Sequence, residues 1–254
     1  MKPGGRGEAR RRSRIGRLGS SLLGAAVLAA GAMGAAGCGG GDEPRLTVSA
    51  ASSLKTAFTE HAETFDGAKV RLSFGGSDQL AAQIRAGARP DVFAAANTEL
   101  PRQLHAEGLV EAPVRFASNR LVVAVRDDGG VRAVAELAEP GTKIAVGSPS
   151  VPVGSYTRGA LRRLDPGVAA NVASEEPDVS SIVARVRAGA VDAGFVYATD
   201  VRPLEELRAI ELPFRTRVEY AAAVVRGTKN TREARRFVRG LRGAKALRDA
   251  GFGP

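Results

Sequence analysis

The chain has 254 residues, of which 44% are hydrophobic and 25% are charged. This composition is typical of a globular protein with one large domain or two smaller ones. The formal net charge is +10, but residues 1–37 carry seven Lys/Arg and one acid, so the remainder has a net charge of only +4. Because the basic excess is concentrated at the front, we do not expect a nucleic acid partner. A single cysteine excludes an internal disulfide, and with only two histidines a conventional Cys/His zinc site is nearly excluded.

The first 37 residues have the pattern of a secretion signal. The basic segment "RRRSRIGR" precedes an apolar run that is too rich in Gly, Ala and Ser for a typical membrane-spanning helix. The run ends at Cys38 after "AAG", which resembles the lipobox of bacterial lipoproteins, with Ala35 in place of the more usual leucine. The sequence therefore predicts a lipoprotein signal peptide over 1–37, and lipidation of Cys38 would anchor the protein to the outer face of the membrane. Residues 38–43 would form a flexible tether, and the location would be extracytoplasmic or periplasmic.

From Arg45 onward, segments with strand and helix patterns alternate. Strands are predicted at 45–51, 69–74, 91–96, 120–125, 143–149, 171–174, 192–200 and 218–225. Helices are predicted from Leu54 to Phe65, from about Leu80 onward, and at 98–108, 151–164, 178–189, 231–239 and 243–250. This alternation indicates an α/β protein with parallel strands and right-handed crossovers.

At four points a strand runs into a turn of small or hydroxyl residues and then into a helix. The turns lie at Ser53, at Ser77 within "SFGGSDQL", near Val153 and near Val179, two in each half of the chain. In open α/β sheets such turns lie at the carboxyl edge of the strands, where ligands bind. If the halves form separate lobes, four helix N-termini can converge on one cleft.

Several sequence motifs that are typical of enzymes are absent. It contains no G-x-S-x-G elbow, no Walker A sequence and no dinucleotide-binding glycine pattern. His61 lies on the inward stripe of its helix and is expected in the core, and His105 is expected to face solvent. What remains is a set of hydroxyls and helix-start N–H groups, which suits the binding of a small anion.

The chain from Arg45 onward resembles the periplasmic molybdate-binding proteins of bacterial molybdate ABC transporters. The similarity rests on "SAASSLKTAF", "LSFGGSDQLAAQIRAGARPDVFAAAN", "KIAVGSPSVPVGSYTRGAL", "EEPDVSSIVARVRAGAVDAGFVYATD" and "VEYAAAVV", which follow the order and spacing of that family. The resemblance implies the class II periplasmic binding-protein fold, with two α/β lobes, each a mostly parallel sheet flanked by helices. It implies a receptor, not an enzyme, that delivers molybdate or tungstate to a membrane permease and its ATPase. No cofactor and no cation site are expected, and the protein is expected to be a monomer.

The resemblance also implies a set of ligand residues. Ser53 and Ser77 would offer hydroxyl and N–H groups, Val153 and Val179 backbone N–H groups, and Tyr197 its hydroxyl. Taken singly, each serine has the alternative role of a plain N-cap, and Tyr197 that of a core tyrosine satisfied by a neighbour. Val153 stands where the family has a smaller, alanine-like residue, which a backbone donor tolerates. Asp78 follows Ser77 directly, and because a carboxylate repels a dianion we expect it to face solvent or to cap the first helical turn.

The expected lobes are 44–120 with 221–254, and 121–220, with a hinge near 119–121 and 218–221. Since hydroxyls and amides do not titrate near neutrality, the affinity for molybdate is expected to be nearly flat from about pH 6.5 to 8.5. Other functions stay open: the same fold with sulfate, phosphate or thiosulfate, a surface enzyme with Ser53 or Ser77 as nucleophile, or the sensing domain of a transcription regulator. The enzyme would need a base beside the serine, and neither histidine is placed for this role. The transcription regulator would need a DNA-binding motif, and the sequence has none.

Overall fold

The computed structural model describes residues 44–254, which lie within one compact unit, Asp42–Pro254. The predictions for the signal peptide, for Cys38 and for the 38–43 tether fall outside the described residues. No helix in the described part is long and apolar enough to cross a membrane. The same part contains no cluster of His, Cys, Asp and Glu side chains that would hold a metal ion.

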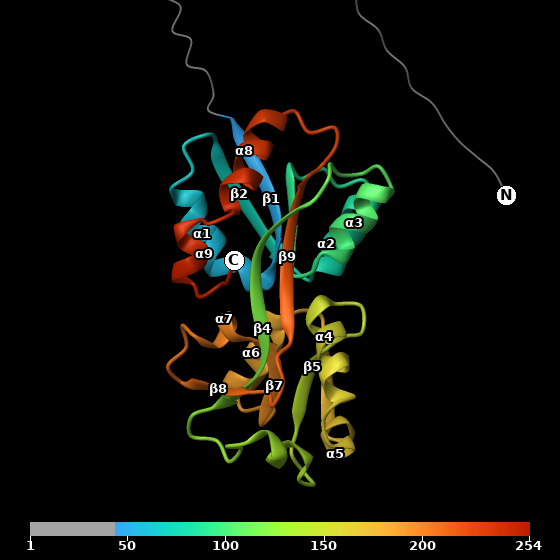
Figure 1. Ribbon diagram of the computed structural model, residues 1–254, viewed down its shortest axis with the longest axis vertical. Coiled ribbons are helices and arrows are strands. Elements are labelled where there is room, and N and C mark those ends of the chain that lie inside the picture. The colour runs from blue at the N-terminus through green and yellow to red at the C-terminus, as the bar shows by residue number, and fades with distance from the viewer. Residues whose placement is uncertain (1–43) are drawn as a thin grey trace, which may run out of the picture. The chain divides into compact units, whose positions relative to one another are not determined.

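The strands of residues 44–254 pair in the order β2-β1-β3-β9-β4-β7-β5-β6, and β8 also pairs with β4. Figure 1 shows two α/β parts, one above the other along the long axis, with β4 and β9 running between them. We call the part around β1–β3 lobe 1 and the part around β5–β8 lobe 2. The strands are β1 (Arg45–Ala51), β2 (Lys69–Gly75), β3 (Val92–Ala95), β4 (Val114–Arg126), β5 (Ile144–Gly147), β6 (Val172–Glu176), β7 (Ala193–Tyr197), β8 (Leu207–Glu211) and β9 (Arg217–Val224).

The helices connect these strands and cover the sheets. Lobe 1 carries α1 (Lys55–Glu63), α2 (Ser77–Arg85), α3 (Glu99–Ala106), α8 (Thr231–Leu241) and α9 (Lys245–Asp249), and a 3-10 turn, η1 (Ser52–Leu54), leads into α1. Lobe 2 carries α4 (Pro152–Leu161), α5 (Pro166–Ala170), α6 (Val179–Arg187), α7 (Ala198–Val201) and the 3-10 helix η2 (Val134–Ala138).

One long strand, β4, belongs to both lobes. Its residues 114–120 pair with β9, and from Leu121 onward it pairs with β7 and β8. The change of partner therefore falls between Arg120 and Leu121. Whether the two lobes move as separate bodies about this point stays a prediction.

The fold class predicted from the sequence is confirmed. Strands linked by helices are parallel, as in β1 with β2 and β3, and β5 with β6 and β7. Strands β4 and β9 pair antiparallel to their neighbours, so each sheet is mixed. The sequence analysis missed β8, α5 and η2, which are short, and it began β4 six residues too late. It also extended the strand at 192–200 too far, because residues 198–200 belong to the short helix α7.

Side chains of β3 point alternately to the two faces of the sheet and pack in two different hydrophobic clusters. Val92 and Ala94 belong to the core that contains Phe58 of α1 and Phe237 of α8. The next residue, Phe93, packs on the opposite face, in a cluster with Leu80, Ala81, Ile84 and Leu104 of α2 and α3. This alternation is the period-2 pattern of a strand covered on both faces.

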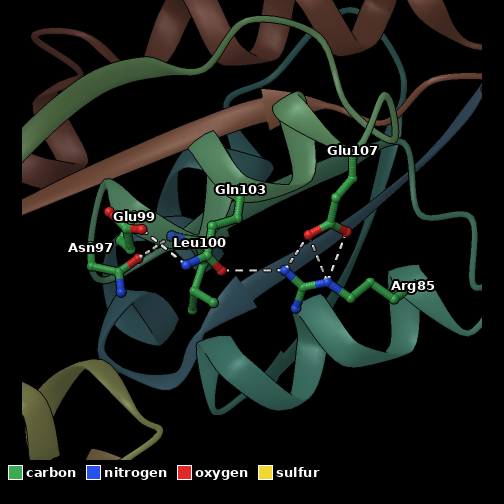
Figure 2. A network of polar contacts seen from close by, with 6 residues as sticks. All are labelled: Arg85, Asn97, Glu99, Leu100, Gln103 and Glu107. Atoms are coloured by element: carbon green, nitrogen blue, oxygen red, sulfur yellow. Dashed lines mark hydrogen bonds and ion pairs between the residues drawn. The ribbon is translucent and has the colours of Figure 1, made fainter.

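A polar network on the surface fixes α2 against α3 (Figure 2). The Arg85 guanidinium donates to the Glu107 carboxylate at 2.8–3.1 Å and to Gln103 Oε1 at 3.3 Å. Asn97 Oδ1 accepts from the Leu100 N–H at 3.1 Å and so satisfies a free donor in the first turn of α3. With the apolar cluster beneath it, this network holds α2, whose N-terminus carries Ser77.

Candidate functional site

The carboxyl ends of six strands, β1, β2, β3, β5, β6 and β7, converge on one small cavity between the lobes. All five residues proposed as ligands contribute to its wall: Ser53, Ser77, Val153, Val179 and Tyr197. The cavity has a volume of about 20 Å³. It has room for a compact group but not for a sugar or a peptide. Its other lining residues are Ala51, Ser52, Gly75, Gly76, Ala96, Val151, Pro152 and Asp178. No Lys, Arg or His is among them.

The Ser77 hydroxyl does not cap a helix. Ser77 is the first residue of α2, Gly76 is the N-cap residue, and no side-chain cap is formed. Ser77 is 2% exposed, and its Oγ accepts from the Ala96 N–H at 3.2 Å. Because a serine hydroxyl has one proton and that contact uses only its acceptor side, the proton is left for a group in the cavity.

Ser53 has a similar arrangement, through partners that sequence analysis did not find. Its Oγ lies 3.0 Å from Tyr220 Oη, and Tyr220 Oη in turn lies 3.5 Å from Asn119 Nδ2. Since an amide nitrogen can only donate, Tyr220 can accept from Asn119 and donate to Ser53, which leaves the Ser53 proton for the cavity. No side-chain cap forms at the start of η1 or α1. The plain N-cap alternative is therefore wrong for both serines.

Lobe 2 contributes donors from the backbone. Helix α4 begins with Pro152, which has no N–H, so the N–H of Val153 is the first one in that helix. Helix α6 begins at Val179, and Asp178 Oδ1 caps it by accepting from the Ser181 N–H at 2.9 Å. Both valines are nearly fully buried. The N–H groups of a first turn have no partner within the helix and carry a partial positive charge, which suits an anion.

The Tyr197 hydroxyl is the most informative atom of the site. Tyr197 is 1% exposed, and among the described residues its Oη has no hydrogen-bond partner. The alternative of a core tyrosine satisfied by a neighbour is therefore wrong. Burial, together with the nearby Tyr220, raises the pKa of Tyr197 well above its ordinary value, so the group stays a neutral donor. A buried unpaired hydroxyl costs stability, and in the wall of a cavity it points to a ligand.

Glycines allow the lobes to approach at this cavity. A Cβ on Gly76 would lie 2.5 Å from the carbonyl oxygen of Pro177 in lobe 2, closer than real atoms approach. In lobe 2, a Cβ on Gly154 would lie 1.9 Å from the carbonyl oxygen of Ser148, so the start of α4 can pack directly against the end of β5. Sterics thus explain the second glycine of "SFGGSDQL", because the other lobe occupies the space that a side chain at this position would need.

The expectation for Asp78 was wrong. It neither faces free solvent nor caps α2: its Oδ2 accepts from Ser150 Oγ of lobe 2 at 2.7 Å, and the residue is half-buried. Asp78 is not among the residues that line the cavity. Its carboxylate therefore joins the two lobes beside the site.

Asp200 is a further titratable group that sequence analysis missed. Its Oδ2 accepts from the Tyr197 N–H at 3.0 Å. Burial raises its pKa to about 7, with a smaller upward contribution from Asp178, while the bond from the Tyr197 N–H opposes the shift. His61, in contrast, packs against Phe237 with ring centroids 5.0 Å apart, and burial lowers its pKa. His61 is half-buried at the edge of the core and not fully inside it as predicted, whereas His105 is exposed, as predicted.

A wider hollow of about 600 Å³ also opens between α1 and the α6–α7 region. It shares Ser52 and Ser53 with the small cavity, and it is lined by charges of both signs, including Lys55, Glu60 and Arg187. Its wall also carries the carboxyl groups of Glu60, Glu63 and Asp200, and carboxylates repel an anion. We therefore place the site at the small cavity.

The fold and the site define a solute-binding protein of the two-lobed periplasmic class. The chain matches the bacterial extracellular solute-binding protein family over residues 46–253 and belongs to that family. The molybdate-binding protein ModA of Mycobacterium tuberculosis is 35% identical over 222 residues, which cover 82% of this chain and 84% of that protein. A putative ABC transporter substrate-binding lipoprotein of Bacillus subtilis is 29% identical over 217 residues, covering 80% and 83%. The periplasmic molybdate-binding protein of Azotobacter vinelandii shares the fold, with a TM-score of 0.72 at 22% identity over 82% of this chain and 99% of that one.

Proposed function

We propose that this protein captures molybdate or tungstate in the cavity between its lobes and delivers it to the permease of an ABC transporter. The observation that carries the proposal is the unpaired, buried Tyr197 hydroxyl in a cavity whose other donors are serine hydroxyls and helix-start N–H groups. Two of the relatives described above are named for molybdate binding. The proposed ligand residues are Ser53, Ser77, Val153, Val179 and Tyr197.

Neutral donors can bind a dianion strongly enough without a cationic side chain. A hydrogen bond to a charged group contributes about 1.5–3 kcal/mol, and several such bonds would act together in a dry cavity. A fully deprotonated tetrahedral oxyanion accepts at every oxygen, and every proposed ligand group can donate. A hydrogen phosphate would bring its own proton and need an acceptor. This donor-only chemistry favours molybdate and tungstate over phosphate.

The rest of the proposal concerns the setting of the protein. It acts as a receptor without catalytic turnover, because neither histidine lies in the cavity wall to serve Ser53 or Ser77 as a base. Lipidation of Cys38 would hold it at the outer face of the membrane, beside the permease and its ATPase, as a monomer. Cys38→Ala should abolish lipidation and release the protein from the membrane. If that variant were still membrane-bound at its precursor mass, the lipoprotein assignment would be wrong.

Calorimetry with molybdate, tungstate, sulfate and phosphate tests the ligand. We expect the first two to bind to one site per chain and to compete with each other. Stronger binding of sulfate or phosphate would replace the proposed ligand and keep the fold and the site. Binding of none of the four would overturn the proposal.

A further inference from the structure

The positive charge of the described chain is concentrated at its C-terminal end. Residues 44–225 contain 21 Lys/Arg and 22 Asp/Glu, whereas residues 226–254 contain nine Lys/Arg and two Asp/Glu. All nine of these basic side chains are exposed. The described chain therefore owes its basic excess to the segment that forms α8 and α9.

Helix α8 separates its apolar and basic residues onto two faces. Ala234, Phe237, Val238 and Leu241 are buried against the core of lobe 1. Arg232, Arg235, Arg236 and Arg239 lie at positions i, i+3, i+4 and i+7, so they share the opposite, solvent-exposed face. The apolar face is packed against the core, whereas the basic face is exposed to solvent, and Arg235 on its edge pairs with Glu111.

This basic face lies beside the first described residue of the chain. Asn230 Nδ2 donates to the Arg45 carbonyl oxygen at 2.8 Å, and the Lys69 N–H donates to the Pro44 carbonyl oxygen at 2.8 Å. Pro44 lines a surface hollow together with Arg232, Arg236 and Arg239. Figure 1 shows α8 next to the start of β1. We call Arg45, Lys69, Arg232, Arg236 and Arg239 the α8 basic face.

Carboxylates neutralise only part of this face. Arg236 pairs with Asp66, and Arg232 pairs with Glu233. Arg45, Lys69 and Arg239 have no ion pair within residues 44–254. The α8 basic face therefore presents a net positive charge to solvent.

We propose that the α8 basic face docks on anionic phospholipid headgroups of the membrane that anchors the protein. The inference rests on the proposed anchoring at Cys38, which lies six residues before Pro44. Six residues span at most about 20 Å when fully extended. A tether of that length keeps the α8 basic face close to the headgroups, where each basic residue contributes about fivefold to binding (about 1 kcal/mol). Docking would orient lobe 1 toward the lipid.

The test uses the mature chain, residues 38–254, with Cys38→Ser, so that no acyl chain contributes. Its partition onto phosphatidylcholine vesicles is measured with and without phosphatidylglycerol. The test variant is Arg232→Gln/Arg236→Gln/Arg239→Gln. The control variant, Arg132→Gln/Arg162→Gln/Arg215→Gln, makes the same change of charge at exposed sites of lobe 2. Molybdate affinity is measured in all three proteins, which keeps a failure of this inference distinct from a failure of the proposed function.

We expect partition only onto the vesicles that contain phosphatidylglycerol, and weaker partition as salt shortens the screening length below about 10 Å. The α8 variant should lose on the order of one hundredfold in partition, from about fivefold for each cation, and the control should lose little. Equal partition of the two variants, or no partition of the parent chain onto anionic vesicles, would overturn the inference. So would arginine-dependent binding to the permease in phosphatidylcholine vesicles alone, because the face would then fit an acidic protein surface.

Discussion

Tyr197 and Tyr220 are two buried tyrosines in contact, with ring centroids 6.0 Å apart, yet their hydroxyls differ. Tyr220 Oη has Ser53 and Asn119 as partners, whereas Tyr197 Oη has none among the described residues. A fold optimised only for stability would not keep an unpaired hydroxyl in its interior. Removing each hydroxyl should therefore have opposite consequences.

Tyr197→Phe should weaken molybdate binding by about 1.5–3 kcal/mol, the contribution of one hydrogen bond to a charged group. The free energy of unfolding without ligand should stay unchanged or rise, because the variant removes an unsatisfied buried group. Tyr220→Phe is the matched control, and it should lose about 1 kcal/mol of stability since its hydroxyl is bonded. Calorimetry and urea unfolding measure the two quantities. Unchanged affinity in Tyr197→Phe would remove this residue from the ligand set.

The titration of Asp200 changes the expectation of a flat pH profile. Its pKa is about 7 in the folded protein and near 3.8 when unfolded, so the folded state binds more protons between these values. Stability should therefore fall as pH rises from about 4 to 7 and then level off. Above pH 7 the ionised carboxylate should also repel the anion and weaken binding by about 1 kcal/mol.

Asp200→Asn tests this effect, because the amide oxygen can still accept from the Tyr197 N–H. The variant should be more stable than the parent above pH 7, and its molybdate affinity should not change between about pH 6 and 8. Burial raises the pKa of the neighbouring Tyr197 and Tyr220 well above its ordinary value, so neither hydroxyl titrates in this range. The same pH dependence in parent and variant would exclude Asp200 as its source.

At the scale of elements, the turn between β2 and α2 is sterically constrained by the other lobe. Gly75 and Gly76 stand side by side in it, but only the second faces the other lobe. A Cβ on Gly75 would make ordinary contacts with Leu80 at 3.7 Å, whereas one on Gly76 would meet the Pro177 carbonyl oxygen at 2.5 Å.

Gly76→Ala should therefore prevent the observed approach of the lobes and weaken molybdate binding at least tenfold, about 1.4 kcal/mol. Stability without ligand should change little, since the backbone of Gly76 is extended and suits any residue. Gly75→Ala should leave the affinity close to that of the parent. Equal affinities in the two variants, measured by calorimetry, would show that this approach is not needed for binding.

The elements with strong periodicity were predictable, and the short ones were not. The stripe of Leu80, Ala81 and Ile84 identified α2, and Asp178 correctly marked the start of α6. Strand β8, "LRAIE", is too short for its alternation to stand out. The start of β4 lacks a run of apolar residues, because only Phe116 and Ala117 are buried among residues 114–120.

The sequence predicted which residues supply the hydrogen-bond donors of the candidate site. It did not predict the residues that hold those donors in place. A strand followed by a serine or valine at a helix start is a local pattern, and the resemblance supplied the rest. The bonds of Ser53 to Tyr220 and of Asp78 to Ser150 join residues 167 and 72 positions apart. Contacts of this kind depend on the tertiary arrangement, and no local pattern in the sequence encodes them.

For the whole molecule, the bond between Asp78 and Ser150 is a direct link across the opening between the lobes. Ser150→Ala would remove a hydrogen bond to a carboxylate, and since Ser150 is exposed we expect a cost of about 1.5 kcal/mol. That cost should appear as roughly tenfold faster molybdate release in stopped-flow measurements, because the closed arrangement loses a contact. Ser155→Ala, at another exposed serine of lobe 2, is the control. Equal release rates would show that the link does not hold the lobes together.

The pairing of β9 has a consequence for biosynthesis. In the sheet of lobe 1, β9 lies between β3 and β4, although it is made about a hundred residues after them. Until residues 217–224 have been synthesised, β3 has an open edge, and Val92 to Ala95 have no partner there. Lobe 2 is complete in sequence by then, whereas lobe 1 must wait for nearly the whole chain. A nascent chain of this protein therefore cannot complete the sheet of lobe 1 until nearly all of its residues have been made.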